Sequence, residues 1–295
     1  MEQYDLRVNL LDIDESIETP SGKNTGYENF PVGSFLLPVK LRPHISTFYR
    51  FARTVDDIAD SSTLPPTEKI TRLEGFENAL LGINYSDPKY NTGHKMRISL
   101  AETKTTSRHC LDLIEAFKQD VTQNRYQDWD DLMYYCERSA APVGRYLVDI
   151  HDGGKEAYEF SDALCKALQV INHIQDCQED FRMMDRVYLP CNWFREKGIS
   201  NLSLNKDKTS PPLRYVFDRC LDATEDLMTE ACQLPVKLKN RRLAMESAII
   251  IKIANTLIQR LRKQDPLVSR VTLGKSTYLW ACLRGFGELA FGNRT

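Results

Sequence analysis

The chain has 295 residues and a formal net charge of −2; 42% of its residues are hydrophobic and 27% are charged. This length is enough for one large domain with a sizeable core, and the composition is ordinary for a soluble globular protein. Because the net charge is small and no basic run is sustained, nucleic-acid binding has little support. The late apolar segment AMESAIIIKIANTLI contains Glu246 and Lys252 and is too short to span a bilayer. The acidic N-terminus has no signal-peptide pattern, so we expect a cytoplasmic protein.

The eight cysteines form neither a CxxC pair nor a Cys/His cluster with zinc spacing. Free, buried thiols in a reducing cytosol are the simplest interpretation. Five of them lie in segments with a helical pattern: Cys110, Cys136, Cys165, Cys177 and Cys220.

Along the chain, residues 1–26 are expected to form a flexible N-terminal arm, because they are polar and rich in Gly, Ser and Thr toward their end. Strand signals are scarce beyond it, and apolar residues recur at helical spacing. The predicted helices cover residues 42–59, 67–81, 94–123, 129–150, 156–181, 213–232 and 243–262. Residues 201–212 are predicted to form a surface loop. The pattern predicts an all-α fold, a single bundle of about eight or more helices over residues 27–290.

A first acidic stripe lies in FYRFARTVDDIAD, residues 48–60. On a helix, Tyr49, Arg53, Asp56 and Asp60 share one face, because steps of four, three and four follow a rotation of about 100° per residue. The two carboxylates would lie about 6 Å apart along the axis. They could share a divalent cation, directly or through water.

The second stripe lies in and before NHIQDCQEDF and consists of Gln169, Asn172, Asp176 and Asp180. Steps of three, four and four again keep these side chains on one face. Mg²⁺ prefers oxygen ligands and is typically held by one or two carboxylates together with substrate phosphates. Two facing helices that each offer DxxxD could therefore hold a diphosphate through Mg²⁺, and Arg53 would add charge-assisted hydrogen bonds.

The alternative interpretation of a single DxxxD helix is a solvated face, which is the commoner case. The apolar flanks in FARTVDDIAD and ALQVINHIQD indicate that both helices are interior, and the two matched stripes occur together. Buried carboxylates without a cation would repel one another. The sequence therefore favours a metal site, with His173 beside it as a packing or supporting residue.

The stretches FYRFARTVDDIAD and LQVINHIQDCQEDFRMMDRVYLP resemble the paired aspartate motifs of the squalene/phytoene synthase family, the head-to-head prenyl synthases. The resemblance covers roughly residues 26–285. It implies a single-domain isoprenoid synthase helical bundle with a central cavity. The stretches ENFPV, SAAPVG and ANTLIQRLRKQDP are most similar to the hydroxysqualene synthase branch of bacterial hopanoid biosynthesis.

Carried over by motif position, the resemblance implies roles for individual residues. The metal ligands would be Asp56, Asp60, Asp176 and Asp180. The catalytic candidates are Tyr49, Arg53, Tyr135, Asn172 and Gln175, with the two tyrosines facing the reacting cation. The substrate-binding candidates are Asn29, Phe30, Ala140, Val143, Gly144, Gln169, Arg186, Tyr188 and Arg270. For the small-residue helix of Ala140, Val143 and Gly144, close helix packing is an equally good interpretation.

Three places depart from the family pattern. Glu28, Asn29 and Phe30 stand where the family commonly has a Ser-Phe pair, and Gln175 replaces an arginine before the second-motif aspartate. A tyrosine expected near residues 254–255 is absent. We hypothesise that Glu28, Asn29 or Gln175 positions a water molecule.

The resemblance implies that presqualene diphosphate loses its diphosphate with the help of Mg²⁺ and that water captures the rearranged cation to give hydroxysqualene. No GxGxxG motif follows a strand, so a Rossmann-type nicotinamide site has no support. Two alternatives stay open: a squalene or phytoene synthase that condenses two farnesyl diphosphates, and a non-catalytic assembly protein on the same fold. Peripheral membrane contact, coupling to other squalene-pathway enzymes and the oligomeric state also stay open.

Overall fold

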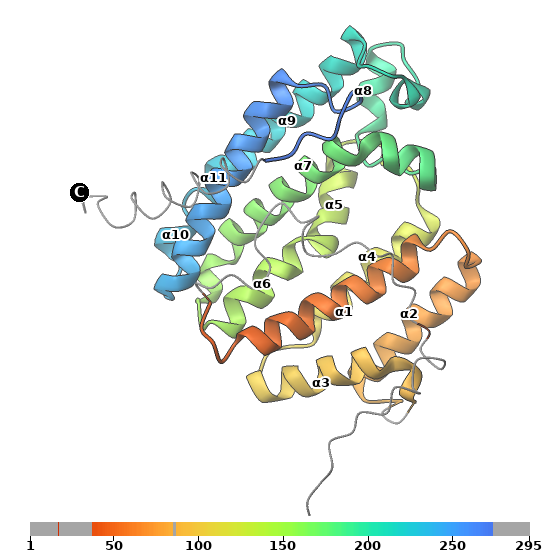
Figure 1. The fold of residues 1–295 in the computed structure, drawn as a ribbon. Coiled ribbons are helices and arrows are strands. Elements are labelled where there is room, and N and C mark those ends of the chain that lie inside the picture. Colours follow the sequence, from red (N-terminus) through yellow and green to blue (C-terminus); the bar gives the residue numbers. More distant parts are fainter. Residues whose placement is uncertain (1–16, 18–36, 85–86, 274–295) are drawn as a thin grey trace, which may run out of the picture.

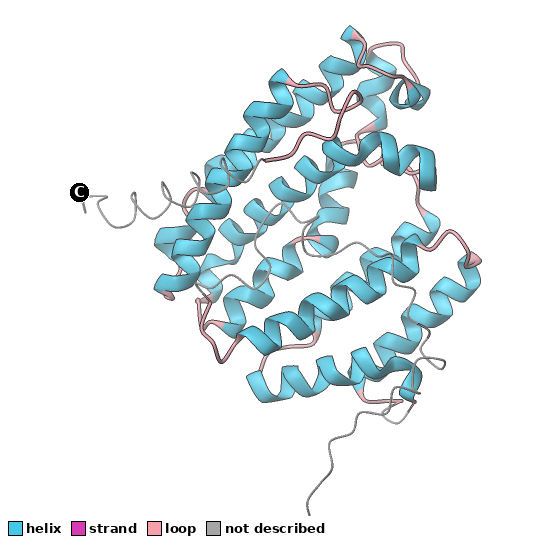
Figure 2. Ribbon diagram, viewed as in Figure 1, coloured by secondary structure: helices cyan, strands magenta, loops and turns pink. Residues whose placement is uncertain are grey.

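The computed structural model describes residue 17, residues 37–84 and residues 87–273. In these ranges the chain is helical, and the single β-type contact is an isolated bridge between Arg125 and Val187 (Figure 2). The α-helices are α1 (Arg42–Asp60), α2 (Pro66–Leu81), α3 (Asn91–Thr103), α4 (Arg108–Thr122), α5 (Trp129–Ser139), α6 (Ala141–Ile150), α7 (Tyr158–Met184), α8 (Cys191–Glu196), α9 (Pro211–Ala231), α10 (Leu234–Lys237) and α11 (Arg241–Lys263). The 3₁₀ turns are η3 (Pro88–Tyr90), η4 (Lys155–Ala157) and η5 (Asn201–Asn205). The predicted all-α class is confirmed.

Two predicted helices are wrong, because each is interrupted and forms two helices in the structure. Residues 94–123 form α3 and α4, because Lys104 takes a left-handed φ of 55° that ends α3. Residues 129–150 form α5 and α6, because Pro142 has no N–H to continue the hydrogen-bond ladder and instead occupies the first turn of α6. The predicted loop at residues 201–212 contains η5 and the start of α9.

The helices bury two hydrophobic clusters. One draws mainly on α1 to α4 and includes Phe48, Phe51 and Phe76, and the other draws mainly on α5 to α11. The long helix α7 packs against α6, α9 and α11, while α1 packs against α3 and α4 (Figure 1). Between the two groups, α1 and α7 are positioned to form opposite walls of one chamber.

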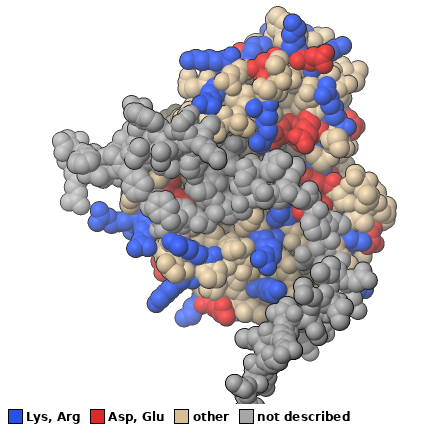
Figure 3. All heavy atoms as spheres, in the orientation of Figure 1, with Lys and Arg blue, Asp and Glu red and all other residues tan. Residues whose placement is uncertain are grey.

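Other features of the described residues agree with the composition. All seven described cysteines are free, and four of the five predicted helical ones are buried, with Cys165 half-buried. On the face seen in Figure 3, basic and acidic side chains are intermixed where described residues are visible. No helix in the described ranges is long and apolar enough to cross a membrane.

Of the predicted N-terminal arm, only Ile17 is described. Its carbonyl oxygen accepts a hydrogen bond of 2.8 Å from Arg72, and its side chain packs against the first cluster. The boundaries of the arm and of the domain at residues 27 and 290 lie outside the described residues and stay predictions.

Candidate active site

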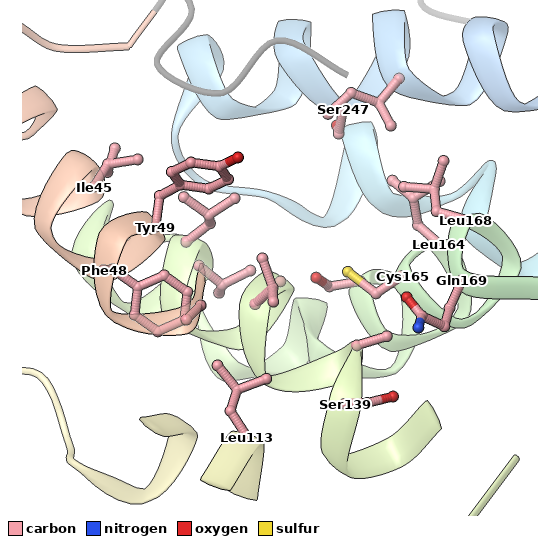
Figure 4. Close-up of a pocket in the computed structure, with 18 of the residues that line it drawn as sticks. Ile45, Phe48, Tyr49, Leu113, Ser139, Leu164, Cys165, Leu168, Gln169 and Ser247 are labelled. Atoms are coloured by element: carbon pink, nitrogen blue, oxygen red, sulfur yellow. The ribbon is translucent and has the colours of Figure 1, made fainter. Parts of the chain in front are cut away.

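The chamber between α1 and α7 is a cavity of about 360 Å³. Its body is apolar: α1 contributes Ile45 and Phe48, α4 contributes Leu113, and α7 contributes Leu164 and Leu168 (Figure 4). Ten of the predicted site residues also line it: Tyr49, Arg53, Asp56, Tyr135, Ala140, Val143, Gly144, Gln169, Asn172 and Tyr188. The fold therefore joins the two predicted stripes, which lie far apart in sequence, at one apolar cavity.

The first acidic wall is the C-terminal half of α1. Arg53 pairs with Asp56 at 3.3 Å and with Asp57 at 3.1 Å. Asp60, one turn after Asp56, accepts a hydrogen bond of 2.8 Å from the Arg186 guanidinium. Burial, followed by the nearby Asp60 charge, raises the pKa of Asp56 well above its ordinary value, although Arg53 opposes the shift. A cation placed here would relieve the cost of two neighbouring carboxylates.

The second acidic wall is the C-terminal half of α7. The Arg270 guanidinium donates to both oxygens of Asp176, at 2.5 and 3.0 Å. Asp180 is half-buried one turn later, whereas Glu179 is exposed, as expected for a residue off the stripe. Gln175 is buried, and its amide donates to the Val271 carbonyl oxygen, so it fastens the segment after α11 to α7.

Asp120 of α4, which sequence reasoning missed, is the centre of a buried hydrogen-bonded hub beside the first wall. Its carboxylate accepts hydrogen bonds from Tyr135 at 2.6 Å and Tyr188 at 3.0 Å. Its backbone carbonyl accepts one of 3.0 Å from Arg186, the same side chain that holds Asp60. Burial raises the pKa of Asp120 to about 6, with Arg186 opposing the shift. The hub thus fixes the two tyrosines and the first wall relative to one another.

The position of Asp120 in the sequence indicates that its side chain is buried. It follows Leu113 by seven residues and Phe117 by three, so it falls on the apolar stripe of an amphipathic helix. A carboxylate at such a position needs buried partners. Asp120 has no second acidic residue at DxxxD spacing, so the stripe pattern that marks α1 and α7 is absent here.

The donor set suits Mg²⁺. No group of three or more His, Cys, Asp or Glu side chains in the described residues forms a ready-made cage. The carboxylates stand instead in two pairs on separate helices, as required when an ion takes one or two carboxylates and completes its shell with phosphate and water oxygens.

The other predicted residues lie around this core or outside the described ranges. Asp60, Asp176, Asp180, Arg186 and Arg270 are not cavity-lining residues but belong to the two walls and their ion pairs. Gln175 does not line the cavity either. Glu28, Asn29 and Phe30 lie outside the described residues.

Comparison with known proteins now places the chain. The family model for squalene/phytoene synthase matches residues 24–277. The chain belongs to this family. It is 39% identical over 259 residues to the hydroxysqualene synthase of Zymomonas mobilis subsp. mobilis, covering 88% of this chain and 87% of that protein. It is also 39% identical over 256 residues to the hydroxysqualene synthase of Rhodopseudomonas palustris, covering 87% of each chain.

The fold agrees with a solved member. The crystal structure of squalene synthase HpnC from Alicyclobacillus acidocaldarius superposes with a TM-score of 0.71 at 27% sequence identity, covering 83% of this chain and 90% of that one. The squalene/phytoene synthase architecture predicted from the two aspartate motifs is therefore confirmed.

Proposed function

We propose that this protein converts presqualene diphosphate into hydroxysqualene in a Mg²⁺-dependent reaction. The observation that carries the proposal is the 39% identity with two hydroxysqualene synthases across nearly the whole of each chain. The geometry supports it: an apolar cavity large enough for part of a prenyl chain lies next to two acidic walls. The coarser activity, chemistry on a prenyl diphosphate, follows from the same features.

In this proposal, Asp56 and Asp60 on α1 and Asp176 and Asp180 on α7 would hold Mg²⁺ together with the substrate diphosphate. The bound ion would supply Lewis-acid stabilisation of the leaving diphosphate. Arg53, which lines the cavity, would donate hydrogen bonds to phosphate oxygens.

The cation left behind is held in the apolar cavity, away from bulk water. Tyr135 and Tyr188 both line it, and their ring centroids lie 5.2 Å apart. Their π faces can stabilise a passing positive charge. Because Asp120 accepts hydrogen bonds from both hydroxyls, the two rings are held in place during the rearrangement.

Product analysis tests the proposal. Purified protein with Mg²⁺ is incubated separately with presqualene diphosphate and with farnesyl diphosphate, without NADPH. We expect hydroxysqualene from presqualene diphosphate. Asp176→Asn should lower the rate at least about 100-fold, because it removes charge stabilisation needed mainly in the transition state. Glu179→Gln, which alters an exposed carboxylate on the same helix, is the matched control and should keep the wild-type rate.

A second candidate, condensation of two prenyl diphosphates, is favoured by one observation: the solved relative from Alicyclobacillus acidocaldarius is described as a squalene synthase. It would use the same four aspartates. Formation of presqualene diphosphate or a later product from farnesyl diphosphate would establish it and overturn the proposal of a second-step enzyme.

A further inference from the structure

Ser139, in the last turn of α5, has a hydroxyl without a hydrogen-bond partner in the described part of the chain. The residue is 9% exposed and lines the cavity. Its Oγ is buried, with no hydrogen-bond partner among the described residues. Buried hydroxyls are normally satisfied by protein or by an ordered water, so an exception in a cavity wall points to a ligand or water partner.

Other hydroxyls in the cavity are already engaged. The Ser247 hydroxyl donates to the Ala244 carbonyl oxygen at 2.9 Å, and that of Tyr135 donates to Asp120 at 2.6 Å. Among the serine hydroxyls that line the cavity in the described ranges, only that of Ser139 is both buried and unpaired.

Ser139 lines the same cavity as Tyr135, one of the residues proposed to stabilise the cation. Ser139 follows Tyr135 by four residues, so both side chains leave the same face of α5, about 6 Å apart along the helix axis. Across the cavity, α7 contributes the amides of Gln169 and Asn172 to the lining. Figure 4 labels Ser139 on α5 and Gln169 on α7 among the residues that line the cavity.

A water that captures a carbocation has a specific requirement. It must direct a lone pair at the carbon, so its two O–H groups must point away, toward hydrogen-bond acceptors. A serine hydroxyl and an amide oxygen are both acceptors, whereas arginine offers donors only. The rest of the nearby cavity wall is largely apolar, which keeps other water molecules away from the cation.

We propose that the Ser139 hydroxyl, together with the side-chain amide oxygen of Gln169 or Asn172, holds the water that attacks the rearranged cation. This inference rests on the proposed hydroxysqualene synthase activity. In the step, the water oxygen forms the new C–O bond and one water O–H bond breaks. The proton passes to an oxygen of the diphosphate released in the same reaction. Gln175, a sequence-based candidate for this role, donates its amide to Val271 instead.

A matched pair of variants isolates the hydroxyl. Ser139→Thr and Ser139→Val have the same shape but differ in the hydroxyl, and Ser139→Ala removes it with less bulk. Ser247→Ala is the control, because it also removes a cavity-lining serine hydroxyl, one already bound to its own helix. Each variant receives presqualene diphosphate in ¹⁸O-labelled water, and both diphosphate release and the organic products are measured.

We expect the Val and Ala variants still to release diphosphate but to lose hydroxysqualene about tenfold relative to proton-loss hydrocarbons, which corresponds to about 1.4 kcal/mol. The Thr variant and Ser247→Ala should keep the wild-type product ratio. An unchanged ratio in the Ala variant would overturn the inference, as would parallel losses of release and product with a lowered melting temperature. If the Val variant does not fold, the Ala variant decides. The proposed function fails separately, if the wild-type protein itself makes no ¹⁸O-labelled hydroxysqualene.

Discussion

Arginine side chains form ion pairs with aspartates of both acidic walls. Arg186 binds Asp60 at 2.8 Å, and Arg270 binds both oxygens of Asp176. Each guanidinium is a fork of donors that fits a carboxylate and a phosphate equally well. When a cation occupies the carboxylates, the same guanidinium can turn its donors to the diphosphate. We propose that these ion pairs hold the walls in place and keep phosphate-binding donors next to the proposed metal ligands.

A second residue-scale consequence concerns His173, which is buried with its ring stacked 3.7 Å from that of Tyr188. Burial, and secondarily the Arg186 charge, lowers the pKa of His173 to about 3. Its ordinary value in an unfolded chain is about 6.5. Between these values the unfolded state binds the extra proton, so folding stability falls as the pH drops from about 6.5 toward 3.

We predict that His173→Phe, which keeps the stacking, reduces the stability lost between pH 7 and pH 5 by roughly 2 kcal/mol. Urea unfolding of both proteins at the two pH values measures the difference. Asp120 has a raised pKa of about 6 and therefore an opposite pH dependence, but it is present in both proteins and cancels. Equal losses in the two proteins would contradict the prediction.

At the scale of elements, the close contact between α6 and α7 explains the glycine of SAAPVG. A Cβ on Gly144 would lie 2.3 Å from Ser161 Oγ and 2.7 Å from Cys165 Sγ, both on α7. Gly144 also lines the cavity, as do Ala140 and Val143. The two interpretations of this helix, substrate contact and close packing, are therefore not exclusive: the close approach of the helices shapes the wall.

We predict that Gly144→Ala destabilises the protein by about 1–3 kcal/mol, because the added methyl group forces packed side chains apart. Thermal denaturation should show a melting temperature lower by about 2–4 °C for each kcal/mol. In a Ser161→Ala background the loss should shrink, since the nearest clashing atom is gone. A melting temperature equal to that of the wild type would show that the helices can separate without cost.

At the scale of the whole molecule, the cavity lies between two hydrophobic clusters, and its acidic walls come one from each side. Leu113 and Phe48 belong to the first cluster, whereas Leu164 and Leu168 belong to the second. A ligand that spans α1 and α7 therefore ties the two halves of the bundle together. Diphosphate alone makes that connection poorly because the carboxylates repel it, and Mg²⁺ alone lacks the phosphate oxygens that would bridge the two walls.

We predict that Mg²⁺ and inorganic diphosphate together raise the melting temperature by about 5–10 °C at ligand concentrations near 100 times Kd, whereas each alone gives a much smaller shift. EDTA should reverse the effect. Asp176→Asn should abolish the joint effect and Glu179→Gln should preserve it, as measured by thermal denaturation. A full shift from diphosphate alone would mean that arginines, rather than metal, hold the ligand.

The sequence by itself determined the local features. Apolar spacing located most helices to within a few residues, and steps of three and four placed each aspartate stripe on one face, because helix geometry is set by neighbours in the chain. It did not reveal the breaks at Lys104 and Pro142, where a left-handed turn and a missing N–H interrupt a continuous apolar pattern.

Only the tertiary structure decided which side chains meet. Asp120 is a hub because α4 brings its carboxylate to the hydroxyls of Tyr135 and Tyr188. The Gln175 amide donates to the Val271 carbonyl oxygen, because the segment after α11 packs against α7. That the Ser139 hydroxyl lacks a hydrogen-bond partner among the described residues could not be read from SAAPVG either. Hydrogen-bond satisfaction and burial depend on partners far away in sequence, and the packing of the whole chain specifies them.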